Sequence, residues 1–193
     1  MFQEIRQEIL EKLELELNRD LCYHDLAHTL SVEEAVIYYS QAENVDEEGV
    51  LNLRYAALFH DAGYLEEYHE NEENGVRIMR SFLERYNVDE DSIREISSII
   101  LATQHGHDPS NLLEEIICDA DHDYLGTPNY IVQARNLYEE MLCFGADLSE
   151  EQWLRDQVTY LKNHHCYYTN TAIERRQNKK ENWIKYLESQ LPE

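Results

Sequence analysis

Apolar residues recur every three to four positions along most of this chain. Near the start, Ile5, Ile9, Leu13 and Leu17 would share one face of a helix. Only three prolines and six glycines interrupt the 193 residues, and no segment alternates apolar and polar residues over a convincing length. The sequence therefore predicts an all-α fold.

We expect the chain to form one domain, because it is long enough for a sizeable core and its composition shows no internal shift. The apolar spacing predicts helices over residues 2–18, from the YHDLAH segment to 44, and over 47–60, 72–86, 90–104 and 112–126. Gly63 is expected to end the third of these helices, since glycine commonly follows a helix C-terminus.

Three N-terminal signals predict the remaining helices. Thr127 before Pro128 predicts an N-cap followed by proline at the first helical position, opening a helix that runs to about residue 144. Capping boxes open the last two long helices: the N-cap hydroxyl accepts from the backbone amide three residues later, and the acidic or amide side chain at that later residue accepts from the N-cap amide. Their members are Ser149 with Gln152, and Thr171 with Glu174.

The charge of the chain limits its partners. It has 16 basic and 40 acidic residues, a formal net charge of −24, which repels both phosphate backbones and anionic lipid headgroups. We therefore expect no nucleic-acid polymer and no membrane surface as a partner. A small phosphorylated substrate is still compatible with this charge if a cation in the site neutralises it locally.

The remaining features of the composition indicate the compartment. Four cysteines lie far apart without CxxC pairing, which favours reduced core thiols over a zinc ribbon or a disulfide framework. The first residues predict an acidic amphipathic helix and not a signal peptide, and no apolar run approaches the ~18 residues that a membrane span needs. The cytoplasm is the expected compartment, and the sequence makes no prediction of the oligomeric state.

A His-Asp doublet, His60-Asp61, follows the apolar run Tyr55–Phe59 directly. Three further His-Asp pairs occur, beginning at residues 24, 107 and 122, but only His60-Asp61 is predicted at the end of a core helix. An aspartate is rarely buried unless it is paired or binds a cation. The doublet is therefore the most informative of the four pairs.

Two other segments of the chain contain candidate metal ligands. His24 and His28 are four residues apart and would share one face of a helix, while Asp119 and Asp121 follow the apolar Ile116–Cys118. The few nearby basic residues cannot neutralise three carboxylates that are buried beside a histidine. A divalent cation resolves this difficulty, because it binds carboxylates and imidazoles together. Two imidazoles and two carboxylates form an N2O2 set that suits Mn, Fe, Co, Ni or Zn better than Ca, with open positions for water or substrate.

The ordered set of these elements resembles the HD-domain superfamily of metal-dependent phosphohydrolases. The resemblance is carried by His28 in YHDLAH, His60-Asp61 in LFHDAGY and Asp121 in DADHDYLG, and extends to ENEENG at 70–75. Residues 164–182 are similar to the closing helix of a branch of uncharacterised members. The resemblance implies a single-domain helical HD-domain fold over residues 1–193, with a motif core at about 20–126 and C-terminal helices at 128–190.

The resemblance also implies a metal site in a central cleft. Its ligands would be His28, His60, Asp61 and Asp121, with Asp119 orienting a ligand or a water, although an exchange of Asp119 and Asp121 stays open. We expect one divalent metal ion: Mn, Fe, Co, Ni, Zn or Mg.

A departure from the family pattern bears on the number of metals. Two-metal members carry additional histidine ligands, but Asn71 stands where one of these would fall, and His69, His105 and His107 are displaced from it. This departure favours a single metal and puts the di-iron oxygenase branch in doubt.

The expected activity is hydrolysis of a phosphate ester or anhydride in a small phosphorylated molecule, a nucleotide by preference, with a metal-activated water. Glu72 is the candidate for proton transfer with the water, and a solvated glutamate at a helix start is the alternative. His24 is the candidate for protonation of the leaving group, with a surface histidine as the alternative. The basic residues Arg176, Lys179 and Lys180 are candidates for binding phosphate, or they pair with acidic neighbours.

Two other functions are compatible with the same scaffold. A metal-dependent oxygenase, such as a mixed-valent di-iron enzyme, or a lyase would need a second metal held by His69 or His105. A non-catalytic module would hold a structural metal in a closed site.

Overall fold

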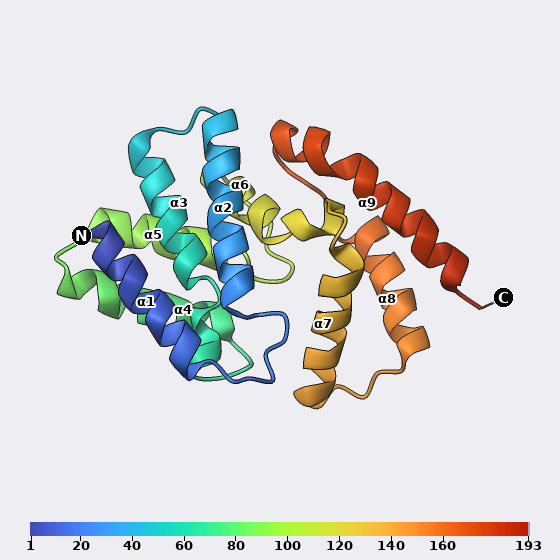
Figure 1. Cartoon of the computed structure of the whole chain (residues 1–193). Helices are drawn as coiled ribbons and strands as arrows, with labels where there is room; N and C mark the ends of the chain where they lie inside the picture. Colours follow the sequence, from blue (N-terminus) through green and yellow to red (C-terminus); the bar gives the residue numbers. More distant parts are fainter. Residues whose placement is uncertain (193) are drawn as a thin grey trace.

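Helices form all the regular structure of the described part of the chain, residues 1–192, in the computed structural model (Figure 1). The predicted all-α fold is therefore confirmed. The α-helices are α1 (Phe2–Glu16), α2 (Leu26–Ala42), α3 (Glu47–Phe59), α4 (Asn71–Arg85), α5 (Glu90–Leu101), α6 (Leu112–Asp121), α7 (Tyr130–Cys143), α8 (Glu150–Asn163) and α9 (Asn170–Gln190). Two short 3₁₀ helices are η1 (Ala62–Leu65) and η2 (Asp123–Gly126).

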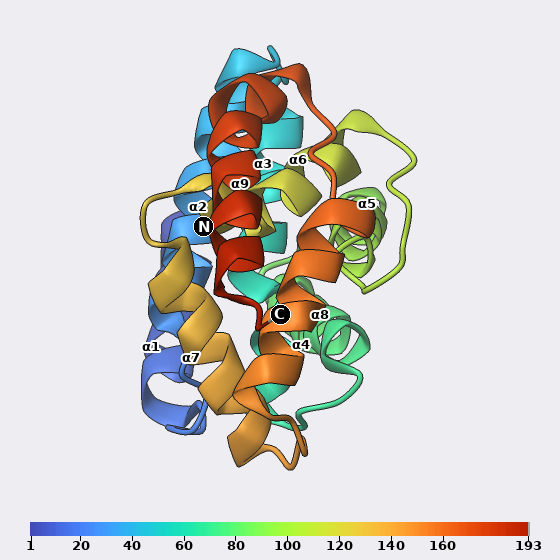
Figure 2. The same cartoon turned by 90° about the vertical axis from the view of Figure 1, so that its right-hand side faces the viewer.

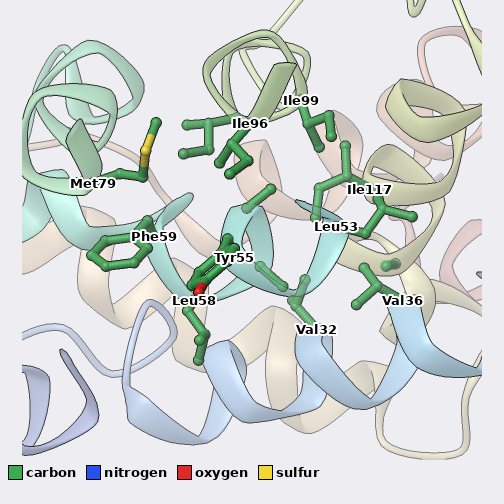
Figure 3. Packing of buried hydrophobic residues seen from close by; sticks show 14 of the residues in the cluster. Val32, Val36, Leu53, Tyr55, Leu58, Phe59, Met79, Ile96, Ile99 and Ile117 are labelled. Carbon is green, nitrogen blue, oxygen red and sulfur yellow. The ribbon is translucent and has the colours of Figure 1, made fainter. Parts of the chain in front are cut away.

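Helix α3 lies at the centre of the main core. It contacts α1, α2, α4, α5 and α6, and its C-terminal half, residues 53–59, is buried except at Arg54. Figure 3 shows Leu53 packed between α2 and the isoleucines of α5, and Phe59 packed beside Met79 of α4. A helix that is apolar on most of its surface is stable only when other helices cover it. The C-terminal end of α3 therefore lies deep inside the protein.

The three C-terminal helices form the other side of the molecule. Helices α7, α8 and α9 lie apart from α1–α5 in Figure 1 and face the viewer in Figure 2. They enclose a smaller apolar cluster of buried residues that includes Leu125, Tyr130 and Leu161. Helix α9 contacts both η2 and α2, which joins the two clusters in one compact domain.

Of the three helices predicted from N-terminal signals, one begins where its signal predicts and two begin elsewhere. The Ser149 hydroxyl accepts from the Gln152 amide and caps α8. Helix α9 instead begins after Thr169, whose hydroxyl accepts from the Ala172 amide. The predicted cap, Thr171, hydrogen-bonds the Glu43 carboxylate with its amide and its hydroxyl. Thr171, which the local pattern predicted to be the N-cap, is therefore hydrogen-bonded to Glu43, a residue distant in the sequence.

The prediction for Thr127 and Pro128 is also wrong. Helix α7 begins at Tyr130 after Asn129, because the Thr127 hydroxyl donates to the Tyr124 carbonyl and accepts from the Asn129 amide in a local turn.

Gly63 does not follow a helix end. It lies inside η1, where a Cβ would come within 1.9 Å of the Asn71 carbonyl oxygen. Its role is therefore a close approach between η1 and the start of α4.

The cysteines are free, as expected, but only one of them is a core thiol. Cys118 is buried, Cys22 is half-buried, and Cys143 and Cys166 are exposed. Over residues 1–192, the structure contains no helix with the length and apolarity that a membrane crossing requires.

Candidate metal centre

Four polar side chains converge where α2, α3 and α6 meet, and each stands at or near a helix end. His28 lies in the first turn of α2, which begins after Asp25 because the Asp25 carboxylate accepts from the His28 amide (2.9 Å). His60 and Asp61 directly follow α3, and Asp121 is the last residue of α6. Three helices thus bring together the four residues that the sequence analysis assigned as ligands.

The side chains of His28, His60 and Asp121 are close enough to share one cation, and Asp61 lies beside both histidines. His28 Nε2 lies 3.0 Å from Asp121 Oδ1 and 3.4 Å from Asp61 Oδ2. His60 Nε2 lies 3.0 Å from Asp61 Oδ2 and 3.3 Å from His28 Nε2. One ligand atom from each of His28, His60 and Asp121 falls within 4.8 Å of the others, the one such group of three or more in the part of the chain that the structure describes.

The hydrogen bonding at His60 leaves electron pairs facing one another. His60 Nδ1 lies 2.9 Å from the Ala57 carbonyl oxygen and therefore carries the proton, so Nε2 of the neutral ring presents its lone pair to the carboxylates. Asp61 Oδ2 is buried without a hydrogen-bond donor. Such an arrangement is costly unless a cation lies between the groups, and two imidazoles with two carboxylates suit a divalent transition metal.

The pKa values of these groups indicate the same demand for positive charge. Without a bound cation, the carboxylates would instead draw a second proton onto the His60 ring: burial favours the neutral form of His60, but the negative charge of Asp61 and the contacts with Asp121 and Asp61 raise the His60 pKa well above 6.5. Burial likewise opposes the charged form of Asp121, yet the His122 charge and hydrogen bonds to His28 and His60 lower the Asp121 pKa well below its usual range. Both carboxylates therefore persist as anions and attract a cation.

A cavity of about 400 Å³ borders two of the candidate metal ligands. Asp61 and Asp121 form part of its wall, together with both candidate catalytic residues, His24 and Glu72. Helices α7 and α8 supply an apolar and aromatic part of the wall: Leu137, Met141, Trp153 and Tyr160. The structure thus brings the candidate catalytic side chains and the ligands to one space.

Glu72 lies near the start of α4 and is half-buried. Burial raises its pKa, and the negative charges of Asp61 and Asp121 add to this shift. A carboxyl group with a raised pKa is suited to exchanging a proton with water near neutral pH.

His24 has a partner that the sequence did not reveal, Glu140 of α7. The His24 Nδ1 atom is hydrogen-bonded to Glu140 Oε1, and Glu140 Oε2 accepts from the amides of Tyr23 (2.9 Å) and His24 (3.0 Å). Burial opposes the charged imidazole, but the charge of Asp61 and the hydrogen bond to Glu140 raise the His24 pKa. Because 116 residues separate His24 from Glu140, no local pattern could have indicated the pair.

Asp119, predicted to orient a ligand or a water, forms its hydrogen bonds with another part of the chain, the segment before α9. It is fully buried, and its oxygens accept from the Tyr168 amide (2.8 Å), the Thr169 amide (2.8 Å) and the Thr169 hydroxyl (2.7 Å). Burial raises its pKa to about 6 despite these hydrogen bonds. Asp119 therefore fastens the segment that leads into α9, while Asp121 faces the histidines.

The three basic residues predicted to bind phosphate do not share one surface. Lys180 is buried and donates to the His165 carbonyl (2.9 Å), and the Lys179 ammonium lies 4.8 Å from the centre of the Trp183 ring. Arg176 alone of the three lines a cavity beside the ligands, a space of about 540 Å³ bordered by His28 and Asp121.

Arg176 is paired within that second cavity. Its Nε and Nη2 atoms donate to the Asp123 carboxylate at 2.7 and 2.6 Å, an arrangement that fixes η2 against α9. The Nη1 group is left for another acceptor.

Among the histidines considered for a second metal, His105 lines the 400 Å³ cavity, whereas His69 and His107 do not. Asn71, at the position of the family's additional histidine, has a buried Oδ1 atom without a hydrogen-bond donor.

Comparisons with known proteins agree with this geometry. The sequence model described as HD domain matches residues 7–123, which include all four proposed ligands. A comparison with curated proteins gives no match.

Several solved structures share the fold over nearly their whole length. Bacillus subtilis YpgQ, determined in complex with ADP, is 17% identical with a TM-score of 0.62, covering 99% of this chain and 95% of that chain. Listeria innocua Lin1889 is 18% identical with a TM-score of 0.65, covering 97% and 96%. A Lactobacillus plantarum protein is 16% identical with a TM-score of 0.66, covering 97% and 95%. At these identities the similarity establishes the fold alone.

Proposed function

This chain belongs to the HD domain family, and we propose that it is a metal-dependent phosphohydrolase acting on a small phosphorylated molecule, specifically a nucleotide. Bacillus subtilis YpgQ, which has the same fold, was determined in complex with ADP, and this supports a nucleotide as the substrate class. The proposed ligands of a single divalent metal are His28, His60, Asp61 and Asp121.

The charge of the 400 Å³ cavity carries this proposal. Its wall contains the carboxylates of Asp61, Glu72, Asp121 and Asp156 and, among the described residues, no lysine or arginine. A phosphate group would be repelled from such a wall. A divalent cation held by Asp61 and Asp121 would balance two of the four charges and supply the attraction that the side chains do not.

A metal bound at this position would polarise a phosphoryl oxygen and lower the pKa of a coordinated water. The protein's own groups complete the reaction. Glu72, beside the ligands and with a raised pKa, would accept the proton of the attacking water. His24, held with its Nδ1 atom toward Glu140, would give a proton to the leaving oxygen.

Arg176 lines the second cavity, which His28 and Asp121 also border. It is therefore retained as a contact for a phosphate group that extends into that space, through the Nη1 group that Asp123 does not use.

The test is phosphate release from a mixed panel of nucleotides with added Mn²⁺, Co²⁺ or Ni²⁺. We expect turnover that requires the metal and that Asp61→Ala and Asp61→Asn abolish. Asp89→Asn is the matched control, since Asp89 is an exposed aspartate that caps α5 and lines neither cavity, and asparagine caps helices equally well.

Metal binding without turnover across the panel would instead favour the non-catalytic module. Two irons per chain with oxygen-dependent activity would favour the oxygenase.

A further inference from the structure

Glu140 is a buried carboxylate that holds one short segment of the chain through three hydrogen bonds. The Tyr68 hydroxyl is a further neighbour, whose pKa is raised by burial and by the Glu140 charge. It lies on α7 and is 0% exposed. Its Oε2 atom accepts from the Tyr23 and His24 amides, and its Oε1 atom pairs with the His24 Nδ1 atom. The two oxygens therefore have separate tasks, one on the backbone and one on the imidazole.

The His24 ring has little freedom to turn. Tyr64 packs against it at 4.5 Å between ring centres, and Tyr23 lies edge-on at 4.7 Å. Because Nδ1 is directed to Glu140, the opposite atom, Nε2, is the one available to the cavity that His24 lines. The Tyr64 hydroxyl, 3.5 Å away, is the nearest recorded contact of Nε2.

A purely structural role would require only Oε2. Fastening the segment before α2 is achieved by the two amide hydrogen bonds, whereas a buried oxygen directed at a ring nitrogen fixes which nitrogen carries the proton. We propose that Glu140 is a positioning residue: its Oε1 atom accepts from His24 Nδ1–H and stabilises the doubly protonated ring, whose Nε2–H then faces the substrate and carries the proton to be transferred. This inference rests on the proposed function, in which His24 serves as the proton donor.

The position of Glu140 gives the C-terminal helices a part in the chemistry. Residue 140 lies outside the segment 7–123 that matches the family, so a side chain from the C-terminal helices would set the orientation of a catalytic histidine in the family core. Helix α7 would then be a component of the active site as well as a wall of the cavity.

The experiment is a double-mutant cycle on the metal-loaded full chain with Glu140→Gln, His24→Ala and the double variant. A glutamine that keeps its oxygen toward the two amides places its NH₂ group at His24 Nδ1 and forces that nitrogen to be an acceptor. We expect Glu140→Gln to lower kcat about 10- to 100-fold with little change in KM. It should have no further effect in the His24→Ala background, because residues that act through one another are not additive.

The matched control is Glu114→Gln. Glu114 is also buried and accepts three hydrogen bonds, from Ser98 and Ser110, but it does not line the cavity. The control should retain kcat, and all variants should bind the metal at the same stoichiometry as the wild type.

A second readout does not depend on turnover. Histidine-selective ¹⁵N NMR should show a protonated His24 Nδ1 in the wild type and in Glu114→Gln, and an unprotonated Nδ1 in Glu140→Gln. Additive losses in the cycle, or an Nδ1 signal unchanged by Glu140→Gln, would overturn the positioning role. A wild type that is inactive across the nucleotide panel would overturn the proposed phosphohydrolase, and the NMR result would still decide whether Glu140 sets the protonation of His24.

Discussion

Replacing Asp119 by alanine should destabilise the protein without removing the metal. The structure gives Asp119 three donors: the amides of Tyr168 and Thr169 and the Thr169 hydroxyl. The hydroxyl can turn to another acceptor, but the two amides cannot. An unsatisfied buried donor costs about 1–3 kcal/mol, so the two amides together imply a loss of about 2–6 kcal/mol. The half-buried position of Tyr168 favours the lower half of that range.

The assay is urea unfolding of wild type, Asp119→Ala and Asp121→Ala, each with and without Mn²⁺. A ligand present at 100 times its dissociation constant stabilises the folded state by about 2.7 kcal/mol. Asp119→Ala should keep this gain while starting from a lower free energy of unfolding. Asp121→Ala should lose the gain. An Asp119→Ala variant that is as stable as wild type but no longer stabilised by Mn²⁺ would refute the reasoning and identify Asp119 as the ligand.

Two further predictions follow from buried contacts. Gly75→Ala should lower the free energy of unfolding by about 1–3 kcal/mol and weaken metal binding in a calorimetric titration, since its Cβ would lie 2.7 Å from the Phe59 carbonyl oxygen at the end of α3; an unchanged affinity would count against this coupling. Burial opposes the charged form of Glu114, but hydrogen bonds from Ser98 and Ser110 outweigh it and lower the Glu114 pKa. The carboxylate therefore stabilises the fold at a pH above the unfolded pKa of about 4.3. This contribution is lost as the pH falls through the lowered pKa of the folded state. Glu114→Gln should therefore reduce the acid dependence of the urea midpoint, and an identical slope in both proteins would contradict the assignment.

Local sequence patterns predicted the helices and the position of the doublet. Apolar residues at helical spacing require burial on one face, and α3 is buried nearly all round, so His60 and Asp61 had to emerge inside the protein. The convergence of His28, His60-Asp61 and Asp121 was predicted from the resemblance of these motifs to the HD-domain superfamily, not from their spacing alone.

Long-range partners decided what the sequence could not. Asp119 and Asp121 are the same residue type, two positions apart, so the sequence does not show which of them is the ligand. The hydrogen bonds of Thr169 to Asp119 distinguish them in the structure. The displaced cap at Thr171 has the same origin, because Glu43 takes its hydroxyl. The burial of Lys180 and the pairing of His24 with Glu140 likewise depend on how α7 and α9 dock, which no local pattern encodes.

The central claim is that His28, His60, Asp61 and Asp121 hold one divalent metal ion. Titration of chelator-treated protein with Mn²⁺ in a calorimeter tests it most directly, with Asp61→Ala and Asp89→Asn in parallel. We expect the wild type and Asp89→Asn to bind about one equivalent of Mn²⁺ per chain, and Asp61→Ala to show no saturable binding. Binding to Asp61→Ala with wild-type affinity, or no binding to the wild type, would contradict it.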